Sequence, residues 1–240
     1  MEPAADSLER LVPDRLEARD ATGLSTLALH LARYEFAARH LRPGRVLDLA
    51  CGAGYGTKLL AERSGGPVLG ADLSPDAIAY ARSRYASPGV EFRVADAMTF
   101  ADERGFDSIV SLETVEHLPD PHRFLARAAA LLRPGGTLVA SVPTTPSTDV
   151  NPHHRHDFTE RSFRAAVRTH GLAEIDCLRQ VQRVPLAAVL GRSETRMGDL
   201  RPNLASWYAR HPRALLRRVA ATLRHGLANH YLTVAWQKPA

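Results

Sequence analysis

The stretch VLDLACGAGYGTKLL, residues 46–60, decides the fold of this chain. It opens with a short apolar run, passes through a loop that holds Gly52, Gly54 and Gly56, and continues with apolar residues at helical spacing. A short apolar run that ends at glycines predicts a buried strand over 45–49, then a tight loop and a helix to about residue 62. A strand, a glycine loop and a helix in this order predict an α/β domain with a ligand site at the loop.

The same alternation continues to the C-terminus. Further strands are predicted over 67–72, 90–94, 106–111, 137–142, 172–181 and 229–237, and further helices over 26–41 and 159–170. Ser74 and Asp120 each precede a proline, the arrangement of an N-cap with proline at the first helical position, which predicts two more helix starts. Strands that alternate with helices predict a doubly wound, mostly parallel α/β sheet of seven strands with Rossmann-like topology.

The composition excludes several classes of protein. Of the 240 residues 45% are hydrophobic, which is enough for a sizeable core. No run approaches the roughly 18 apolar residues of a membrane-spanning helix, and the polar start MEPAADSLER is unlike a signal peptide. Cys51 and Cys177 do not resemble a disulfide framework. We therefore expect both thiols to stay reduced in a cytoplasmic protein that is not inserted into a membrane.

Charged residues are unevenly distributed along the chain, and one segment is strongly basic. We expect a polar N-terminal segment over 1–25 and one domain over 26–240, with an insertion at 186–226 before the last strand. The insertion holds eight arginines against Glu194 and Asp199, a net charge of +6, whereas the whole chain carries +5. The basicity therefore belongs to this one segment.

Helical spacing within the insertion indicates how it folds. Leu215, Val219 and Leu223 predict an amphipathic helix with an arginine face. We expect a lid over the substrate, where the arginines would hold a phosphate, a diphosphate sugar or a carboxylate. A solvated helix face or a dimer contact is the alternative, so a homo-oligomer stays open. The segment is short for specific RNA recognition, which argues against a nucleic-acid partner.

Acidic residues follow two of the predicted strands, at the edge where the glycine loop also lies. Asp72 ends the second strand, where a carboxylate can accept both hydroxyls of a ribose. Asp96 follows the third strand, where a carboxylate can accept from an adenine amino group while the Ala97 N–H bonds a ring nitrogen. These positions predict a site for an adenosine-containing ligand.

The motifs VLDLACGAGYGTKLL, GADLSPDAIAYAR, VADAM, FDSIVSLETVEHLPDP and LLRPGGTLVASVPTT together resemble the class I S-adenosylmethionine (SAM)-dependent methyltransferases. The resemblance covers about residues 26–171 and implies a last strand that is antiparallel. It also implies SAM as methyl donor and S-adenosylhomocysteine as product. The positions that it assigns to the cofactor are Asp48, Ala50, Gly52, Gly54, Tyr55, Asp72, Leu73, Asp96, Ala97 and Ser111. Ala50 departs from the family pattern, which usually has glycine there.

The stretch SLETVEHLPDP, residues 111–121, combines carboxylates and an imidazole where the fourth strand ends. If it forms one helical turn, Glu113, Glu116 and His117 lie at i, i+3 and i+4 on one face, toward the methyl donor. The turn resembles the E-x-x-E-H motif of ubiquinone-pathway O-methyltransferases and of small-RNA 2′-O-methyltransferases, where it is interpreted as a divalent-metal site. That resemblance implies Mg²⁺ or Mn²⁺ as a further cofactor.

A second cluster, NPHHRHDFT at 151–159, follows the fifth strand. His154 and His156 are both candidates for a fourth metal ligand, and His154 matches the histidine of a similar motif in bacterial methyltransferases. Without metal, His117 or His154 would act as general base, with Glu113 as the third catalytic candidate. A purely structural helix cap is the remaining alternative.

These observations favour an O-methyltransferase that acts on a hydroxyl of a small molecule. Expected acceptors are natural products of secondary metabolism, including antibiotic biosynthesis, sugars, and quinone-like compounds, with an anionic group on the acceptor to match the arginines. N-methylation of an amino sugar or another small amine is one alternative, because an amine needs no strong base. Methylation of an RNA 2′-hydroxyl is the other.

Overall fold

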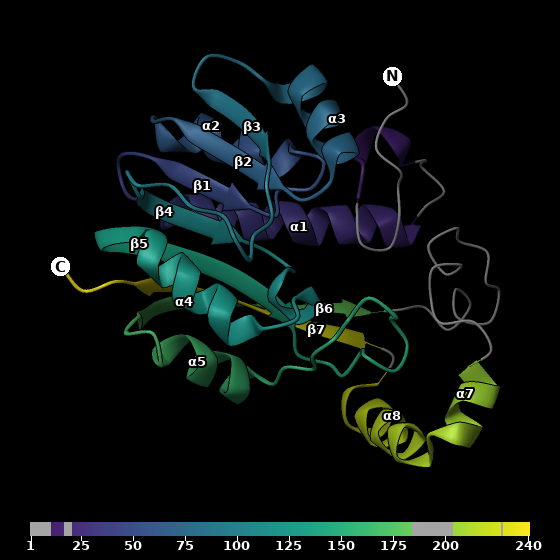
Figure 1. The fold of residues 1–240 in the computed structure, drawn as a ribbon. Coiled ribbons are helices and arrows are strands. Elements are labelled where there is room, and N and C mark those ends of the chain that lie inside the picture. The colour runs from purple at the N-terminus through teal and green to yellow at the C-terminus, as the bar shows by residue number, and fades with distance from the viewer. Residues whose placement is uncertain (1–10, 17–20, 184–203, 227) are drawn as a thin grey trace.

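A computed structural model describes residues 11–16, 21–183, 204–226 and 228–240, and every structural statement below concerns these residues. A seven-stranded sheet with the order β3-β2-β1-β4-β5-β7-β6 forms the centre of the molecule (Figure 1). The strands are β1 (Val46–Leu49), β2 (Val68–Asp72), β3 (Val90–Val94), β4 (Phe106–Ser111), β5 (Leu132–Pro143), β6 (Ala173–Arg183) and β7 (Ala228–Gln237).

The direction of the strands agrees with the predicted fold. Strands β1 to β5 pair in parallel, whereas β7 lies antiparallel between β5 and β6. The mostly parallel sheet and its antiparallel last strand are thus confirmed. Strand β5 begins earlier than predicted, at Leu132, because the chain pairs with β4 on both sides of an irregularity at Gly135, where the register shifts between Phe106 and Ser108.

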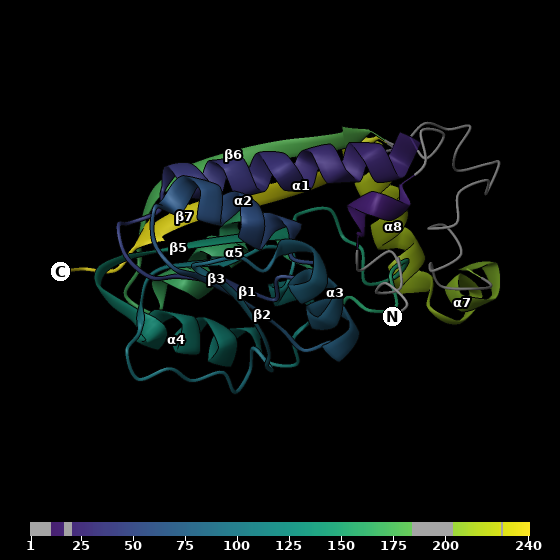
Figure 2. The same ribbon diagram turned by 90° about the horizontal axis from the view of Figure 1, so that it is seen from above.

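Helices cover both faces of the sheet. Helix α1 (Ala21–Arg39) packs against α2 (Tyr55–Ser64) on one side, and α4 (Pro121–Leu131) packs beside α5 (Glu160–Arg168) on the other (Figure 2). Helix α3 (Pro75–Tyr85) packs on β2 and β3. The predicted helix starts are confirmed, since the side chains of Ser74 and Asp120 accept from the backbone N–H groups of Ala77 and Arg123.

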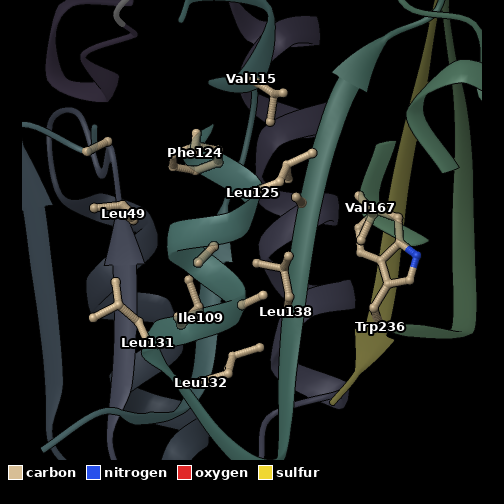
Figure 3. Packing of buried hydrophobic residues seen from close by; sticks show 14 of the residues in the cluster. Leu49, Ile109, Val115, Phe124, Leu125, Leu131, Leu132, Leu138, Val167 and Trp236 are labelled. Carbon is tan, nitrogen blue, oxygen red and sulfur yellow. The ribbon is translucent and has the colours of Figure 1, made fainter. Parts of the chain in front are cut away.

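The largest cluster of buried apolar residues lies between the sheet and α4 and α5. Ile109 and Leu138 of neighbouring strands are fully buried there, together with Phe124 of α4 (Figure 3). Trp236 of β7 packs edge-on against Phe163 of α5, with 5.3 Å between ring centroids. Burial of this kind fixes the strand ends that carry the polar residues of the site.

Part of the predicted polar N-terminal segment packs against the domain. Residues 1–10 of that segment lie outside the described residues, but Val12 is fully buried against Ala53 and Tyr80. A 3-10 turn follows at Pro13–Arg15, and α1 begins at Ala21 instead of 26. An apolar residue in a polar stretch therefore packs beside the glycine loop.

The insertion before β7 is helical where it is described. It holds α7 (Leu204–Arg210) and α8 (Pro212–His225), which lie together beyond one end of the sheet (Figure 1). Residues 186–203 of the predicted insertion lie outside the described residues. No described helix combines the length and apolar character needed to cross a membrane.

Candidate functional site

The glycine loop has an open side and a packed side. Ala50, Gly52 and Gly54 all have positive φ angles of 69°, 56° and 87°. A Cβ atom on Gly52 would meet nothing within 4 Å, whereas one on Gly54 would lie 2.6 Å from the Ala81 Cβ and 2.9 Å from the Phe92 ring. Gly52 therefore leaves space for a ligand, and Gly54 allows the loop to pack on α3 and β3. Ala50 holds a conformation that glycine would adopt at lower cost.

Asp72 fixes this loop from the neighbouring strand. Its carboxylate accepts from the Gly52 N–H and from the Ser74 N–H, both at 2.9 Å. Ser74, and not Asp72, is the cap of α3, as the sequence predicted. Leu73 next to it is 67% exposed, an apolar side chain at the rim of the site.

The candidate adenine residues lie after β3. The Asp96 carboxylate accepts from the Met98 N–H at 2.8 Å, and Asp96 is exposed while Ala97 is buried. This turn holds an exposed carboxylate at the same sheet edge as Asp72, which is the arrangement predicted for an adenosine-containing ligand.

Asp48 lies beneath the loop, where the side chain is fully buried. Its carboxylate accepts from the Thr57 hydroxyl at 2.6 Å and from the Tyr34 hydroxyl at 3.3 Å. Burial raises the pKa of Asp48 to about 7, and the hydrogen bonds from Thr57 and Tyr34 oppose that rise. The sequence reasoning missed Tyr34 and Thr57. The one sequence signal for a close neighbour was the glycine at position 56. A Cβ atom there would lie 1.9 Å from the Tyr34 ring, so only glycine allows that ring to pack against the helix.

Ser111 at the end of β4 is a buried polar group that a cofactor would satisfy. The Ser111 hydroxyl has no hydrogen-bond partner among the described residues. A buried hydroxyl in that state costs free energy unless a ligand or water supplies a partner. The Ser111 hydroxyl, the open space at Gly52 and the exposed Asp96 are compatible with the SAM that the resemblance implies.

The acidic turn differs from the predicted single helical turn. Glu113 has a φ angle of 50°, and a 3-10 turn covers only Val115–His117. The carboxylate of Glu113 accepts from the Ser141 hydroxyl at 2.7 Å and lies 3.7 Å from the Arg33 guanidinium. The expectation that Glu113 shares one helical face with Glu116 and His117 is therefore wrong, because the left-handed residue ends the regular spacing.

Arg33 of α1 is a functional candidate that the sequence reasoning missed. It is 1% exposed, donates to the Gln180 side chain at 2.8 Å and lies over the Tyr231 ring at 4.3 Å. Burial raises the pKa of Tyr231, and the carboxylate of Glu113 adds to the rise. Nothing about a single arginine on the helix predicted over 26–41 indicated this burial.

Glu116, His117 and His154 come together. One ligand atom from each lies within 4.8 Å of the others, and this is the group of possible metal ligands found among the described residues. The Glu116 side chain is 1% exposed, and its carboxylate lies 3.7 Å from the His117 Nε2. The two imidazole rings meet edge to face, with 4.7 Å between centroids. The acidic turn and the histidine cluster therefore do come together as predicted. Three of the expected residues take part, and Glu113 does not.

Main-chain hydrogen bonds join the two segments. The Glu116 carbonyl accepts from the N–H groups of Arg155 and His156 at 2.8 and 3.1 Å. The His156 Nε2 is bonded to the Leu118 carbonyl at 3.0 Å, so His156 is a structural residue and not a fourth ligand. The expectation for His156 is corrected because its ring is turned toward the peptide backbone.

The Nδ1 atoms of the two histidines have partners that orient the rings. His117 Nδ1 lies 3.2 Å from the His153 carbonyl, and His154 Nδ1 lies 2.5 Å from the Ser147 hydroxyl. The other ring nitrogen of His117, Nε2, lies 3.7 Å from the Glu116 carboxylate. Metal-binding histidines are typically oriented in this way, with one ring nitrogen held by the protein and the other toward the metal.

Comparison with known proteins agrees with this geometry. Residues 47–140 match the family model described as a methyltransferase domain. The chain is 40% identical over 120 residues to the "Ubiquinone biosynthesis O-methyltransferase" of Xanthomonas campestris pv. campestris (strain B100), a match of 48% of this chain and 50% of that protein. It is 41% identical over 100 residues to "Methyltransferase GfsG" of Streptomyces halstedii, which covers 39% of this chain and 36% of that protein. The chain thus matches half or less of the length of these relatives.

A solved structure extends the likeness of the fold to nearly the whole chain. N-methyltransferase NodS from Bradyrhizobium japonicum WM9, in complex with S-adenosylhomocysteine, superposes with a TM-score of 0.62 at 18% identity. The match covers 98% of this chain and 95% of that one. The family match over residues 47–140 and the likeness of the fold confirm the resemblance to the class I SAM-dependent methyltransferases that the motifs predicted.

Proposed function

We propose that this chain transfers a methyl group from SAM to a hydroxyl group of a small molecule. The observation that carries the choice of a hydroxyl is the group of Glu116, His117 and His154, whose ligand atoms lie within 4.8 Å of one another. A hydroxyl needs help to lose its proton, and carboxylate and imidazole groups give that help directly or through a metal.

The role of the protein toward the cofactor is to bind SAM and to orient it. SAM, when bound, supplies a methyl group that its sulfonium already activates. Asp72 would accept from the ribose hydroxyls, with Asp96 and Ala97 at the adenine and Leu73 against its face. The backbone at Ala50, Gly52 and Gly54, with Tyr55 and Ser111, would hold the methionine end. Asp48 would support the site indirectly, by accepting hydrogen bonds from Tyr34 and Thr57 under the glycine loop.

On the acceptor side, the three residues would hold a divalent cation such as Mg²⁺ or Mn²⁺. One carboxylate and two imidazoles suit Mn²⁺, Fe²⁺ or Co²⁺ at least as well as Mg²⁺, which prefers oxygen ligands. Three protein ligands leave positions for the acceptor. The three ligand atoms lie within 4.8 Å of one another, so small side-chain movements would bring them around one ion.

The same residues allow a reaction without metal. His117 is partly exposed beside Glu116, and its Nδ1 is directed to a carbonyl, so Nε2 could accept the proton of the acceptor hydroxyl. Glu113 is the less favourable base, because its carboxylate already accepts from Ser141 and faces Arg33. A metal requirement distinguishes the two mechanisms.

Metal content and metal affinity test the site independently of the unknown acceptor. Elemental analysis uses protein prepared without chelator or affinity tag, and calorimetry titrates Mn²⁺ into the wild type, Glu116→Gln and His154→Ala. His153→Ala is the matched control, since this exposed neighbour contributes only its carbonyl to His117. We expect Mn²⁺ binding in the wild type and the control, and its loss in the two variants. Equal binding in all four would remove the metal assignment.

A panel of acceptors then tests the reaction. Formation of S-adenosylhomocysteine is followed with catechols, sugars, amino sugars and a short RNA, each with and without chelator. Turnover of hydroxyl acceptors that chelation abolishes supports the metal mechanism. Turnover that survives chelation but is lost in His117→Ala supports the base. Turnover of amines alone, or of the RNA alone, would refute the proposed acceptor class.

A further inference from the structure

Helix α8 presents its large apolar side chains to solvent. Leu215, Leu216, Val219 and Leu223 are 42%, 69%, 47% and 83% exposed. The residues of α8 that are buried are instead the small Ala214 and Ala221. A surface helix normally buries its apolar stripe and exposes its polar face. The predicted amphipathic helix is therefore present, but it lies with the opposite face against the protein.

The four exposed residues form a continuous ridge. At 100° per residue, Leu215, Val219 and Leu223 follow one another at intervals of four, and Leu216 lies beside Val219 and Leu223. Three exposed arginines lie along one border of the ridge, at positions 213, 217 and 224. We refer to these seven residues as the basic apolar ridge.

The stretch of chain around the ridge is positively charged and contains a tryptophan. No acidic residue occurs between residues 204 and 226, whereas this stretch holds Arg210, Arg213, Arg217, Arg218 and Arg224. Just before α8, the Trp207 ring stacks on His211 with 4.4 Å between centroids. Tryptophan at the edge of a basic apolar surface is typical of segments that lie at a membrane interface.

We propose that the basic apolar ridge binds the surface of a membrane that contains anionic lipids, with the axis of α8 parallel to that surface. The leucines would enter the boundary between headgroups and acyl chains, and the arginines would pair with lipid phosphates. A lipid surface needs no shape-matched partner, and its anionic headgroups complement the arginines beside the exposed leucines, which favours lipid over a folded protein. A second copy of the chain would bring arginines against arginines, so charge disfavours it.

The ridge is joined to the candidate site. Tyr208 of α7 donates to the Asp149 carboxylate at 2.7 Å, and Arg218 of α8 donates to the Pro146 carbonyl at 3.5 Å. Both partners belong to the loop that leads from β5 to His154. A membrane-bound α8 therefore keeps the histidine loop close to the lipid, within reach of an acceptor that dissolves there. The binding itself does not depend on the proposed reaction.

Sedimentation with lipid vesicles tests the proposal on the full chain. The vesicles contain phosphatidylcholine alone or mixed with phosphatidylglycerol. The variants are Leu216→Ser with Leu223→Ser, and Arg213→Gln with Arg217→Gln. Ile175→Ser is the matched control, an apolar residue that is 47% exposed near the start of β6, whose other end pairs with the residues that follow α8. All the changed side chains are exposed, so folding should survive, and circular dichroism checks this.

We expect the wild type and the control to bind the anionic vesicles and to be released by salt. The double leucine variant should bind at least ~10-fold more weakly, because two apolar anchors are lost. The double arginine variant should lose its preference for anionic over neutral vesicles. Binding to neither kind of vesicle would overturn the proposal, as would equal binding of the wild type and the leucine variant. Self-association that the leucine change abolishes would instead assign the ridge to a second copy.

Discussion

Replacement of Asp48 by asparagine should change how the stability of the protein depends on pH. Burial raises the pKa of this carboxyl from 3.8 to about 7 in the folded chain. The folded state therefore holds the proton more tightly than the unfolded state does. Its stabilising contribution is fully present below pH 3.8 and is lost as the pH rises to about 7.

The size of the effect follows from the shift. A difference of about 3 pKa units corresponds to about 4 kcal/mol, and between the two pKa values each pH unit changes the free energy of unfolding by about 1.4 kcal/mol. Urea titrations would measure this free energy for the wild type and for Asp48→Asn between about pH 5 and pH 9. The free energy of unfolding of the wild type minus that of the variant should fall by about 2 kcal/mol from pH 5 to pH 7 and by about 3 kcal/mol in all, and should level off above about pH 8.

The contact with Thr57 supplies the control. Its hydroxyl lies 2.6 Å from the carboxylate and stabilises the ionised form. Thr57→Val should therefore raise the pKa of Asp48 and extend the fall in stability to higher pH, but it should have no pH-dependent effect when combined with Asp48→Asn. Parallel pH profiles for the wild type and Asp48→Asn would show that Asp48 keeps an ordinary pKa, and the account of the loop support would be refuted.

Four further predictions concern the cofactor loop, the thiols and the insertion. Asp72→Ala should weaken SAM binding by about 1–3 kcal/mol, measured by calorimetry, and unchanged affinity would contradict its role. Ala50→Gly should stabilise the chain by about 0.5–1 kcal/mol in urea titrations, because relief of the left-handed conformation outweighs the backbone entropy of glycine. Mass spectrometry of denatured, unreduced protein should find Cys51 and Cys177 as thiols, and a disulfide would disprove this. Deletion of 186–226 should abolish turnover with little change in SAM affinity; equal loss of both would make the segment part of the core.

Most of the sheet could be predicted from the sequence, because its strands are short apolar runs that end at glycine, proline or acidic residues. Strands β3 and β4 have the predicted bounds, and β7 begins one residue before its predicted start. The two N-caps were predictable for the same local reason, since a capping residue followed by proline has few other interpretations. The antiparallel direction of the last strand came from the family resemblance, and the order of β6 and β7 was not predicted.

Side chains whose positions depend on distant segments could not be predicted. Arg33 is separated by 147 residues from Gln180, its hydrogen-bond partner, and no local pattern indicates that contact. Val12 belongs to a polar stretch, yet it is fully buried because the glycine loop and α3 offer an apolar surface. The outward face of α8 is a similar case: the helical spacing predicted the stripe, but only packing decides which face is buried.

For the group of Glu116, His117 and His154, local spacing in the sequence predicted only part of the arrangement. Spacing alone placed Glu113, Glu116 and His117 on one face, and a single residue with positive φ removed Glu113 from it. His154 then takes part because the Glu116 carbonyl accepts from two N–H groups of the histidine loop, which is a main-chain contact that side-chain patterns do not reveal. One residue thus supplies both a carboxylate to the group and the peptide oxygen that brings the loop to it. Glu116→Gln keeps the peptide contact and removes only the charge, so its effect on Mn²⁺ affinity separates the chemistry of this residue from its structural role.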